Sequence, residues 1–167
     1  MKRILLTAVV LALMIPGMAK AQTTAGGTIA VDIGQLLFVD ISSGDNQTLT
    51  PGLTEFDNGY DDASALTVNS SGNTAYNLFI RGDNATWTYD PDGTTNPDPS
   101  KPVGDLNFKL ASLGTYTAMT TANQLVEAFT APGDNSSSVD LRVDLSYAND
   151  VEGIYTLDYT VEVLPAP

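Results

Sequence analysis

The stretch SVDLRVDLSYANDVEGIYTLDYTVEV, residues 138–163, contains two segments in which apolar and polar residues alternate. In Ser138–Tyr147, and again from Tyr155 to Val163 within Ile154–Val163, the odd-numbered residues are all apolar or aromatic and the even-numbered ones are polar. A period of two predicts strands with one buried face and one solvated face. Between them, Ala148–Gly153 has the Asn, Asp and Gly content of a turn. It predicts a hairpin or a short crossing between two sheets.

Shorter segments upstream alternate in the same way, and stretches rich in Asn, Asp, Gly, Ser and Pro separate them. These segments are Ser64–Asn69, Thr74–Arg81, Ala85–Tyr89 and Asp105–Ala111. A helix and an irregular strand both fit Thr121–Phe129, and we favour the strand. The whole pattern predicts an all-β fold, an immunoglobulin-like β-sandwich of about seven to nine antiparallel strands.

The first residues have the features of a secretory signal peptide. A basic start is followed by the apolar run Ile4–Ile15, and Ala19-Lys20-Ala21 supplies the small residues of a cleavage site. We therefore expect three parts: a signal peptide at 1–21, an N-terminal segment at 22–34 and a β-sandwich domain at 35–167. The mature chain should be secreted, to the extracellular space or the cell surface, with the periplasm as an alternative.

The N-terminal segment carries a candidate assembly strand, made of Ile29, Val31, Ile33, Leu37 and Val39. Apolar and other residues alternate up to Ile33, Gly34 interrupts the pattern, and Gln35–Ile41 is almost continuously apolar. Such a run predicts a strand that is central in a sheet or covered. An ordinary first strand that crosses between sheets at Gly34 is the interpretation we favour. The alternative is a strand that adds to the sheet of a neighbouring subunit.

Two segments resemble exported immunoglobulin-like subunits: ALTVNSSGNTAYNLFIRGDNATW at residues 65–87 and GIYTLDYTVEV at residues 153–163. Their layout is similar to spore-coat-U-type and fimbrial families and to WxL-type cell-surface domains. These families place an Asn-containing turn between two mid-chain strands and end on a Gly-x-Tyr-Thr strand. The chain lacks the cysteines of many fimbrial subunits and has no WxL motif. The resemblance implies a structural or adhesive role at a surface, in some cases with subunits joined by donated strands.

The composition argues against most enzyme classes. The chain has no Cys and no His, which excludes thiol catalysis, a Ser-His-Asp triad and a His-ligated zinc site. We therefore expect no enzymatic activity. All twenty acidic residues follow the expected cleavage site, where only four basic residues remain. Such a charge disfavours nucleic acid, and without a second long apolar run the mature chain is not expected to insert into a membrane.

Two sets of residues are candidate binding sites. Asp90, Asp92, Asn96 and Asp98 place oxygen-bearing side chains in one loop, the ligand type that Ca²⁺ prefers. We favour an ordinary solvated loop, and expect no other cofactor; the acidic segment Asp57–Asp62 is a weaker calcium candidate. An aromatic platform for glycan is the second idea, although we favour a core position for its tryptophan. Its residues would be Trp87, Tyr89, Tyr60 and Tyr116.

Four Asn-x-Ser/Thr sequons fall in expected loops or turns, at Asn46, Asn69, Asn84 and Asn135. They are candidate glycosylation sites in a host that modifies exported proteins.

The sequence as a whole favours a non-enzymatic structural subunit of a surface filament, pilus-like fibre or surface layer. Its partners would be other copies of itself, joined in one version by N-terminal strand donation. The alternative is a secreted β-sandwich module that binds carbohydrate or calcium.

Overall fold

The computed structural model describes residues 32–90 and 96–167, and the side chains of 96–100 lie outside that description. The chain divides into two units, Met1–Ile33 and Gly34–Pro167, and the fold is that of the second unit. The signal peptide and most of the N-terminal segment, including Ile29 and Val31, therefore lie outside the described residues.

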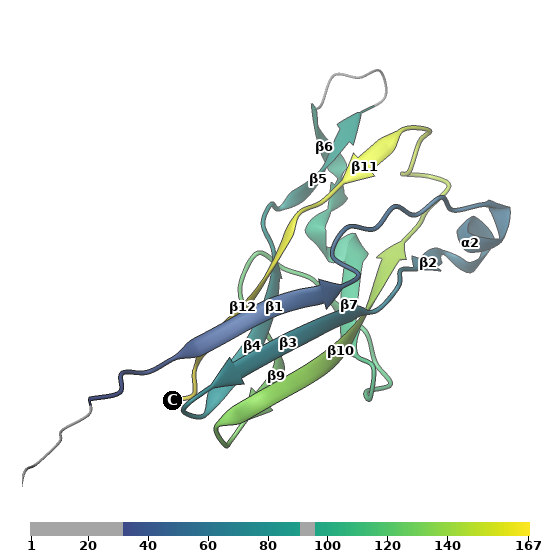
Figure 1. Ribbon diagram of the computed structural model, residues 1–167. Helices are drawn as coiled ribbons and strands as arrows, with labels where there is room; N and C mark the ends of the chain where they lie inside the picture. Colours follow the sequence, from purple (N-terminus) through teal and green to yellow (C-terminus); the bar gives the residue numbers. More distant parts are fainter. Residues whose placement is uncertain (1–31, 91–95) are drawn as a thin grey trace, which may run out of the picture. The chain divides into compact units, whose positions relative to one another are not determined.

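One layer of the fold is a six-stranded antiparallel sheet (Figure 1). Its main path, in spatial order, is β1 (Leu37–Ser43), β3 (Leu66–Gly72), β10 (Gly133–Asp144), β7 (Leu106–Leu110) and β8 (Thr117–Ala118). The short strand β2 (Tyr60–Asp62) pairs with the last residues of β10. A six-residue helix, α2 (Leu53–Asn58), precedes β2, and Gly59 ends it in the left-handed conformation.

The remaining strands form two smaller antiparallel sheets. The first has the order β12 (Tyr159–Pro165), β4 (Tyr76–Gly82) and β9 (Gln124–Phe129). The second has the order β11 (Ile154–Thr156), β5 (Thr86–Asp90) and β6 (Asn96–Pro102). β4 is followed by β5 in the chain, and β11 is followed by β12. Since β4 pairs with β12 and β5 pairs with β11, the same two chain segments run through both small sheets. A single 3-10 turn, η1 (Val103–Asp105), joins β6 to β7.

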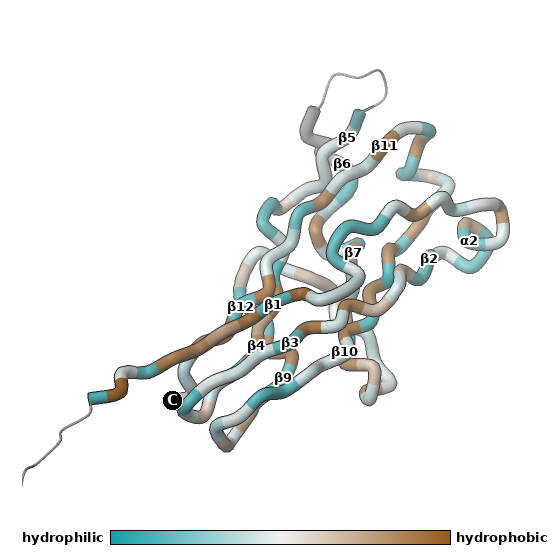
Figure 2. Tube along the Cα trace, viewed as in Figure 1, coloured by the Kyte–Doolittle hydropathy of each residue, from teal (hydrophilic) through white to brown (hydrophobic). Residues whose placement is uncertain are grey.

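The core lies where the inward faces of these sheets meet. Its central members come from β3 and β4, where Leu66, Val68 and Leu78 are fully buried and Ile80 is 1% exposed. The other buried members are Trp87, Leu106, Phe108, Met119, Val126, Val139 and Leu141. Figure 2 shows brown, apolar positions alternating with paler ones along these strands. With no cysteine in the chain, this burial supplies most of the stabilisation.

The structure confirms the all-β sandwich, but with twelve strands in the described residues and not the expected seven to nine. Strands such as β2, β8 and β11 have only two or three residues, too few to show an alternating pattern. The alternating segment 154–163 is divided at Leu157–Asp158, so that β11 and β12 pair with different strands, β5 and β4. Because β10 pairs with neither of them, residues 148–153 make a crossing between sheets and not a hairpin. The irregular strand expected in Thr121–Phe129 is β9, whose register against β4 shifts at Leu78/Phe79.

A glycine fixes the bend that follows β1. Gly44 has a positive φ of 82°, and a Cβ atom built on it would lie 2.6 Å from the backbone oxygen of Ala65. A side chain there would therefore be strained both by its backbone conformation and by this contact. Gly34, in contrast, has no atom within 4 Å of the position a Cβ would take.

We predict that Gly44→Ala lowers the free energy of unfolding by about 1–3 kcal/mol, because a residue with a side chain is strained at this φ. Urea denaturation measures the change. The matched control, Gly34→Ala, should unfold at the wild-type urea concentration. Equal stability of the two variants would contradict the strain at Gly44.

Candidate functional site

Of the edge strands among the described residues, β1 and β12 lie on the same flank of the sandwich. β1 pairs with β3 alone, and β12 pairs with β4 alone. The two strands belong to different sheets, yet their Cα atoms come within 8 Å of each other. We call this flank of the sandwich the β1/β12 side. Unpaired N–H and C=O groups along a strand edge are a template for pairing with another strand.

The core is incompletely covered on the β1/β12 side. The inward residues of β1 and β12 pack against the core but are only partly buried; they are Val39, Ile41, Tyr159, Val161 and Val163. The inward residues of the central strands are fully buried in comparison; Val68 is 0% exposed and Ile80 is 1% exposed. The apolar core is therefore only partly covered beside these two strand edges.

β1 and the residue that precedes it also present apolar side chains to solvent. Leu36 is 65% exposed and Phe38 is 58% exposed. This overturns the expectation that Gln35–Ile41 is central or covered, because β1 is an edge strand with an open outer face. Beside Phe38, polar residues of β3 and β10 line a shallow depression of about 360 Å³. In Figure 2 the first part of β1 is brown.

Hydrogen bonds fix the point at which the N-terminal segment joins the domain. The Asn73 side chain accepts a hydrogen bond from the Leu36 backbone N–H and donates one to the Gly34 carbonyl, both at 2.8 Å. Gln35 donates to the Thr74 hydroxyl at 2.8 Å. The last turn of the chain lies at the same end, where the Ala166 N–H donates to the Ala75 carbonyl. The candidate strand therefore enters the domain beside the end of β12. Of its residues, Leu37 and Val39 lie in β1, and Ile33 lies outside any strand.

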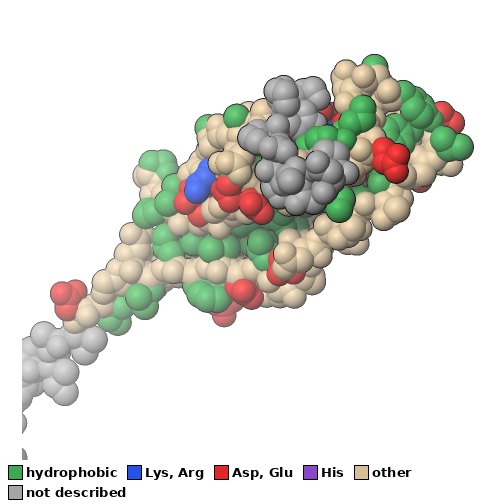
Figure 3. Space-filling view, turned by 90° about the horizontal axis from the view of Figure 1, so that it is seen from above, with side chains coloured by type: hydrophobic (Ala, Val, Ile, Leu, Met, Phe, Trp, Pro, Cys, Tyr) green, Lys and Arg blue, Asp and Glu red, His purple; other side chains and the backbone are tan. Residues whose placement is uncertain are grey.

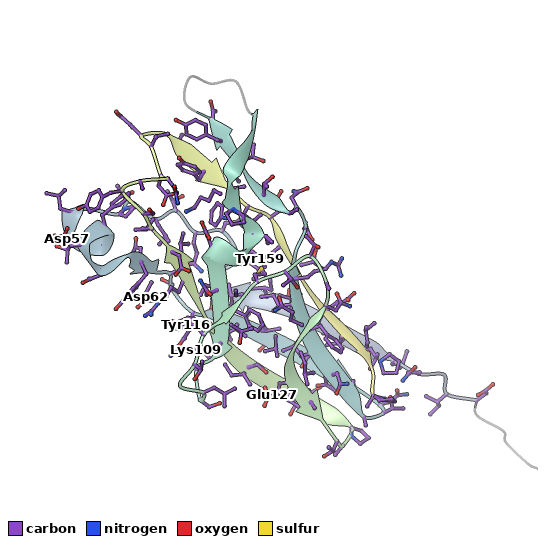
Figure 4. The ribbon with its side chains drawn as sticks, turned by 180° about the vertical axis from the view of Figure 1, so that it is seen from behind. Asp57, Asp62, Lys109, Tyr116, Glu127 and Tyr159 are labelled. Carbon is purple, nitrogen blue, oxygen red and sulfur yellow. The ribbon has the colours of Figure 1, made fainter. Side chains whose placement is uncertain are left out.

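A tyrosine closes the other end of the β1/β12 side. The Tyr159 hydroxyl of β12 donates to the Asp45 carbonyl oxygen, just after β1, at 3.2 Å. Burial, and secondarily the negative charge of Asp45, raises the pKa of Tyr159 to about 12. Figure 4 shows Tyr159 near the middle of the domain, away from the other labelled side chains.

The calcium candidates receive no support from the described residues. Asp90 ends β5, Asp92 lies outside the description, and Asn96 and Asp98 are described only as backbone in β6. In the weaker candidate segment, Asp57 accepts a hydrogen bond from Tyr147, and Asp62 is held by Arg142 at 2.6 and 2.9 Å. No group of three acidic side chains suited to a metal occurs in the described part of the chain. Figure 3 shows acidic side chains scattered over the face that it draws.

The structure does not gather the four aromatic residues of the candidate platform at one place, although Tyr60 and Tyr116 share a partner. Trp87 is 8% exposed in the core and donates to the Pro102 carbonyl at 3.1 Å, which confirms the core interpretation. Tyr89 packs against Tyr155. Tyr60 and Tyr116 stack on the Arg142 guanidinium, 3.6 and 4.3 Å from their ring centres.

The Arg142 cluster also engages neighbouring charges. Hydrogen bonding to Arg142 is the main reason that the pKa of Asp62 is lowered. Lys109 lies over the Tyr116 ring and pairs with Asp140 at 3.4 Å. Figure 4 shows Asp62, Tyr116 and Lys109 one after another along the same side of the domain. The charged groups and rings of this cluster therefore contact one another.

The sequons occupy two kinds of position. Asn46 and Asn84 lie in exposed bends, as expected. Asn69 and Asn135 lie in strands β3 and β10 and not in turns, because both strands extend further toward the turn end than the alternation indicated. The Asn135 amide donates to the Tyr76 hydroxyl at 2.8 Å.

Sequence reasoning missed Lys101, the most deeply buried charged group of the described residues, at 3% exposure. Its only signal in the sequence is its rarity, as one of four basic residues in the mature chain.

Comparison with known proteins gives no sequence match and one weak structural alignment. No protein-family model matches the sequence, and no curated protein matches it. A solved structure of a chaperone-usher pilus aligns over 91% of this chain and 100% of that chain, with 13% identity and a TM-score of 0.44. Within the described residues, no helix is both long enough and apolar enough to cross a membrane.

The raised pKa of Tyr159 predicts a loss of stability at alkaline pH. Deprotonation charges the phenol, so the unfolded chain, with a pKa near 10, releases this proton before the folded chain does at about 12. The stabilisation is complete below about pH 10 and is lost as the pH rises toward 12. Tyr159→Phe should be less stable at pH 7, by about 0.5–1.5 kcal/mol for the lost hydrogen bond. It should also lose less stability between pH 9 and pH 11 than the wild type, as thermal unfolding would measure. Parallel pH curves for the two proteins would contradict this role.

Proposed function

We propose that the chain is an exported, non-enzymatic structural subunit that assembles with copies of itself by strand addition at the β1/β12 side. The observation that carries the proposal is the combination of two unpaired strand edges with an incompletely covered core between them. A strand added there would pair its backbone with the edge and cover the half-buried Val161 and Val163.

The segment 28–33 of another copy has the pattern that such a strand requires. Ile29, Val31 and Ile33 alternate with Thr28, Ala30 and Asp32, so one face of the strand is apolar. Its own domain holds Gly34–Leu36 by hydrogen bonds, and we propose that the strand given to another copy ends just before this point. The expected signal peptide, with cleavage near Gln22, would place this segment at the mature terminus.

The free energy gained by adding the strand is close to the free-energy cost of association, so we expect assembly to depend on concentration. Burial of three large aliphatic side chains contributes roughly 5–9 kcal/mol, and each strand hydrogen bond adds about 1 kcal/mol net. Association opposes this with about 4–15 kcal/mol of lost freedom. The two sums are comparable, so the mature protein should pass from single subunits to assemblies as its concentration rises.

Replacing the apolar face of the segment tests the proposal. Ile29→Asp/Val31→Asp should keep the mature protein at the mass of one subunit, because two charges cannot enter the core side of the added strand. The matched control Thr28→Asp/Ala30→Asp adds the same charge on the opposite face and should still assemble. Light scattering over a wide concentration range measures the mass. A wild-type protein that stays monomeric throughout, or a control that fails like the test variant, would exclude assembly by this strand.

A second candidate function, carbohydrate binding, draws on the depression beside Phe38. An exposed aromatic ring flanked by hydroxyl and amide groups of β3 and β10 is a surface on which a sugar can lie. Titration of polysaccharide in a calorimeter would show binding that Phe38→Ala removes. Absence of binding to the wild type would exclude this candidate without affecting the assembly proposal.

A further inference from the structure

Lys101 lies in an unusual place for a lysine. It stands near the end of β6, its side chain is 3% exposed, and its Nζ atom is 2.8 Å from Oδ1 of Asp150, which is 7% exposed. The rings of Trp87 and Tyr155 lie 5.5 and 5.7 Å from Nζ. Each partner is therefore shielded from water. A buried ion pair of this kind is costly to form, because both charges lose their hydration.

A second acid completes the group. Oδ2 of Asp105, in η1, is 3.5 Å from the same Nζ atom and is partly open to solvent. Burial raises the pKa of Asp105, although the charge of Lys101 opposes the shift. A carboxyl with a raised pKa is suited to accept a proton and give it up again.

Each oxygen of the Asp150 carboxyl has a hydrogen-bond donor. Its Oδ2 accepts a hydrogen bond from the Ser146 backbone N–H at 2.8 Å, and its Oδ1 faces Lys101. Lys101 is itself positioned by a hydrogen bond to the Asp144 carbonyl at 3.0 Å. The amine is thus fixed against one oxygen of the carboxyl, and a backbone donor is fixed against the other.

We propose that Lys101 and Asp150 form an intramolecular isopeptide bond, with Asp105 as the proton carrier. The reactive form of the pair is the neutral one, amine and carboxylic acid, and the 2.8 Å contact between Nζ and Oδ1 lets a proton pass between the two groups. The residues meet only in the folded domain, because they are 49 positions apart in the sequence.

The step balances without any outside reagent. A proton passes from the Lys101 ammonium to Oδ1 of Asp150, and the free amine attacks Cγ to form the new C–N bond. The negative charge develops on Oδ2, where the Ser146 N–H stabilises it. Asp105 takes a proton from the bound nitrogen and gives it to Oδ1, and the Cγ–Oδ1 bond breaks. One water molecule leaves, one amide is formed, Asp105 returns to its starting state, and nothing is oxidised or reduced.

The bond would connect the end of β6 to the loop between β10 and β11. It would close a loop of 49 residues in a chain that has no cysteine. As with a disulfide, closing such a loop reduces the conformational freedom of the unfolded chain. This role is independent of strand addition, and either proposal can fail without the other.

The intact mass of the denatured mature protein tests the bond directly. It should be lower than the mass of the amino-acid sequence by one water molecule, and a protease digest should give a branched peptide that joins Lys101 to Asp150. Lys101→Arg and Asp150→Ala should both show the full sequence mass. The matched control Lys109→Arg removes the half-buried lysine that pairs with Asp140, and it should keep the deficit.

Asp105→Ala tests the proton carrier and should slow the loss of water after refolding, while leaving both reacting residues in place. A wild-type protein that folds and shows the full sequence mass would overturn the proposal and leave a buried ion pair. A water deficit that persists in Lys101→Arg would also overturn it, because the water would then have been lost elsewhere, for example through a cyclic imide at an aspartate.

Discussion

Backbone N–H and C=O groups along β12 are paired with β4 on one side and, within the described residues, with no strand on the other. This edge adjoins a partly covered region of the core, where Val161 and Val163 remain half-buried. At this edge the backbone groups lack a second strand to pair with, and the adjacent apolar side chains lack full cover. One additional strand would satisfy both, and the pinning of Gly34–Leu36 by Asn73 and Thr74 fixes where the candidate strand begins.

The strands of the fold could be predicted from the sequence because their side-chain period is visible in it. Residues such as Val139 and Leu141 are buried as the alternation requires. The pairing of the strands could not be predicted in this way. Alternation continues unbroken through Leu157, although the strand before it pairs with β5 and the strand after it pairs with β4. Likewise, an apolar run fits a central strand and an uncovered edge equally well, and β1 is the edge.

Much less of the site could be predicted. The alternation before Gly34 indicated a strand for assembly, but the edge that could receive it became visible only with the sheet order. Lys101, Asp105 and Asp150 are drawn together by β6, η1 and the crossing after β10, and no local pattern connects them. The alternative of an aromatic platform could not be decided from the sequence for the same reason, because the spacing of Trp87 and Tyr116 carries no information about which elements pack together.

Hydrogen exchange along β12 tests the account most directly, because it reports whether the unpaired edge becomes paired. In a mature chain that lacks residues 22–33, the backbone amides of Tyr159–Leu164 that face away from β4 should exchange rapidly. In the complete mature chain at assembling concentration they should become protected, while amides of β4 are protected in both. Equal protection of the β12 amides in the two proteins would contradict the claim that the N-terminal segment occupies this edge.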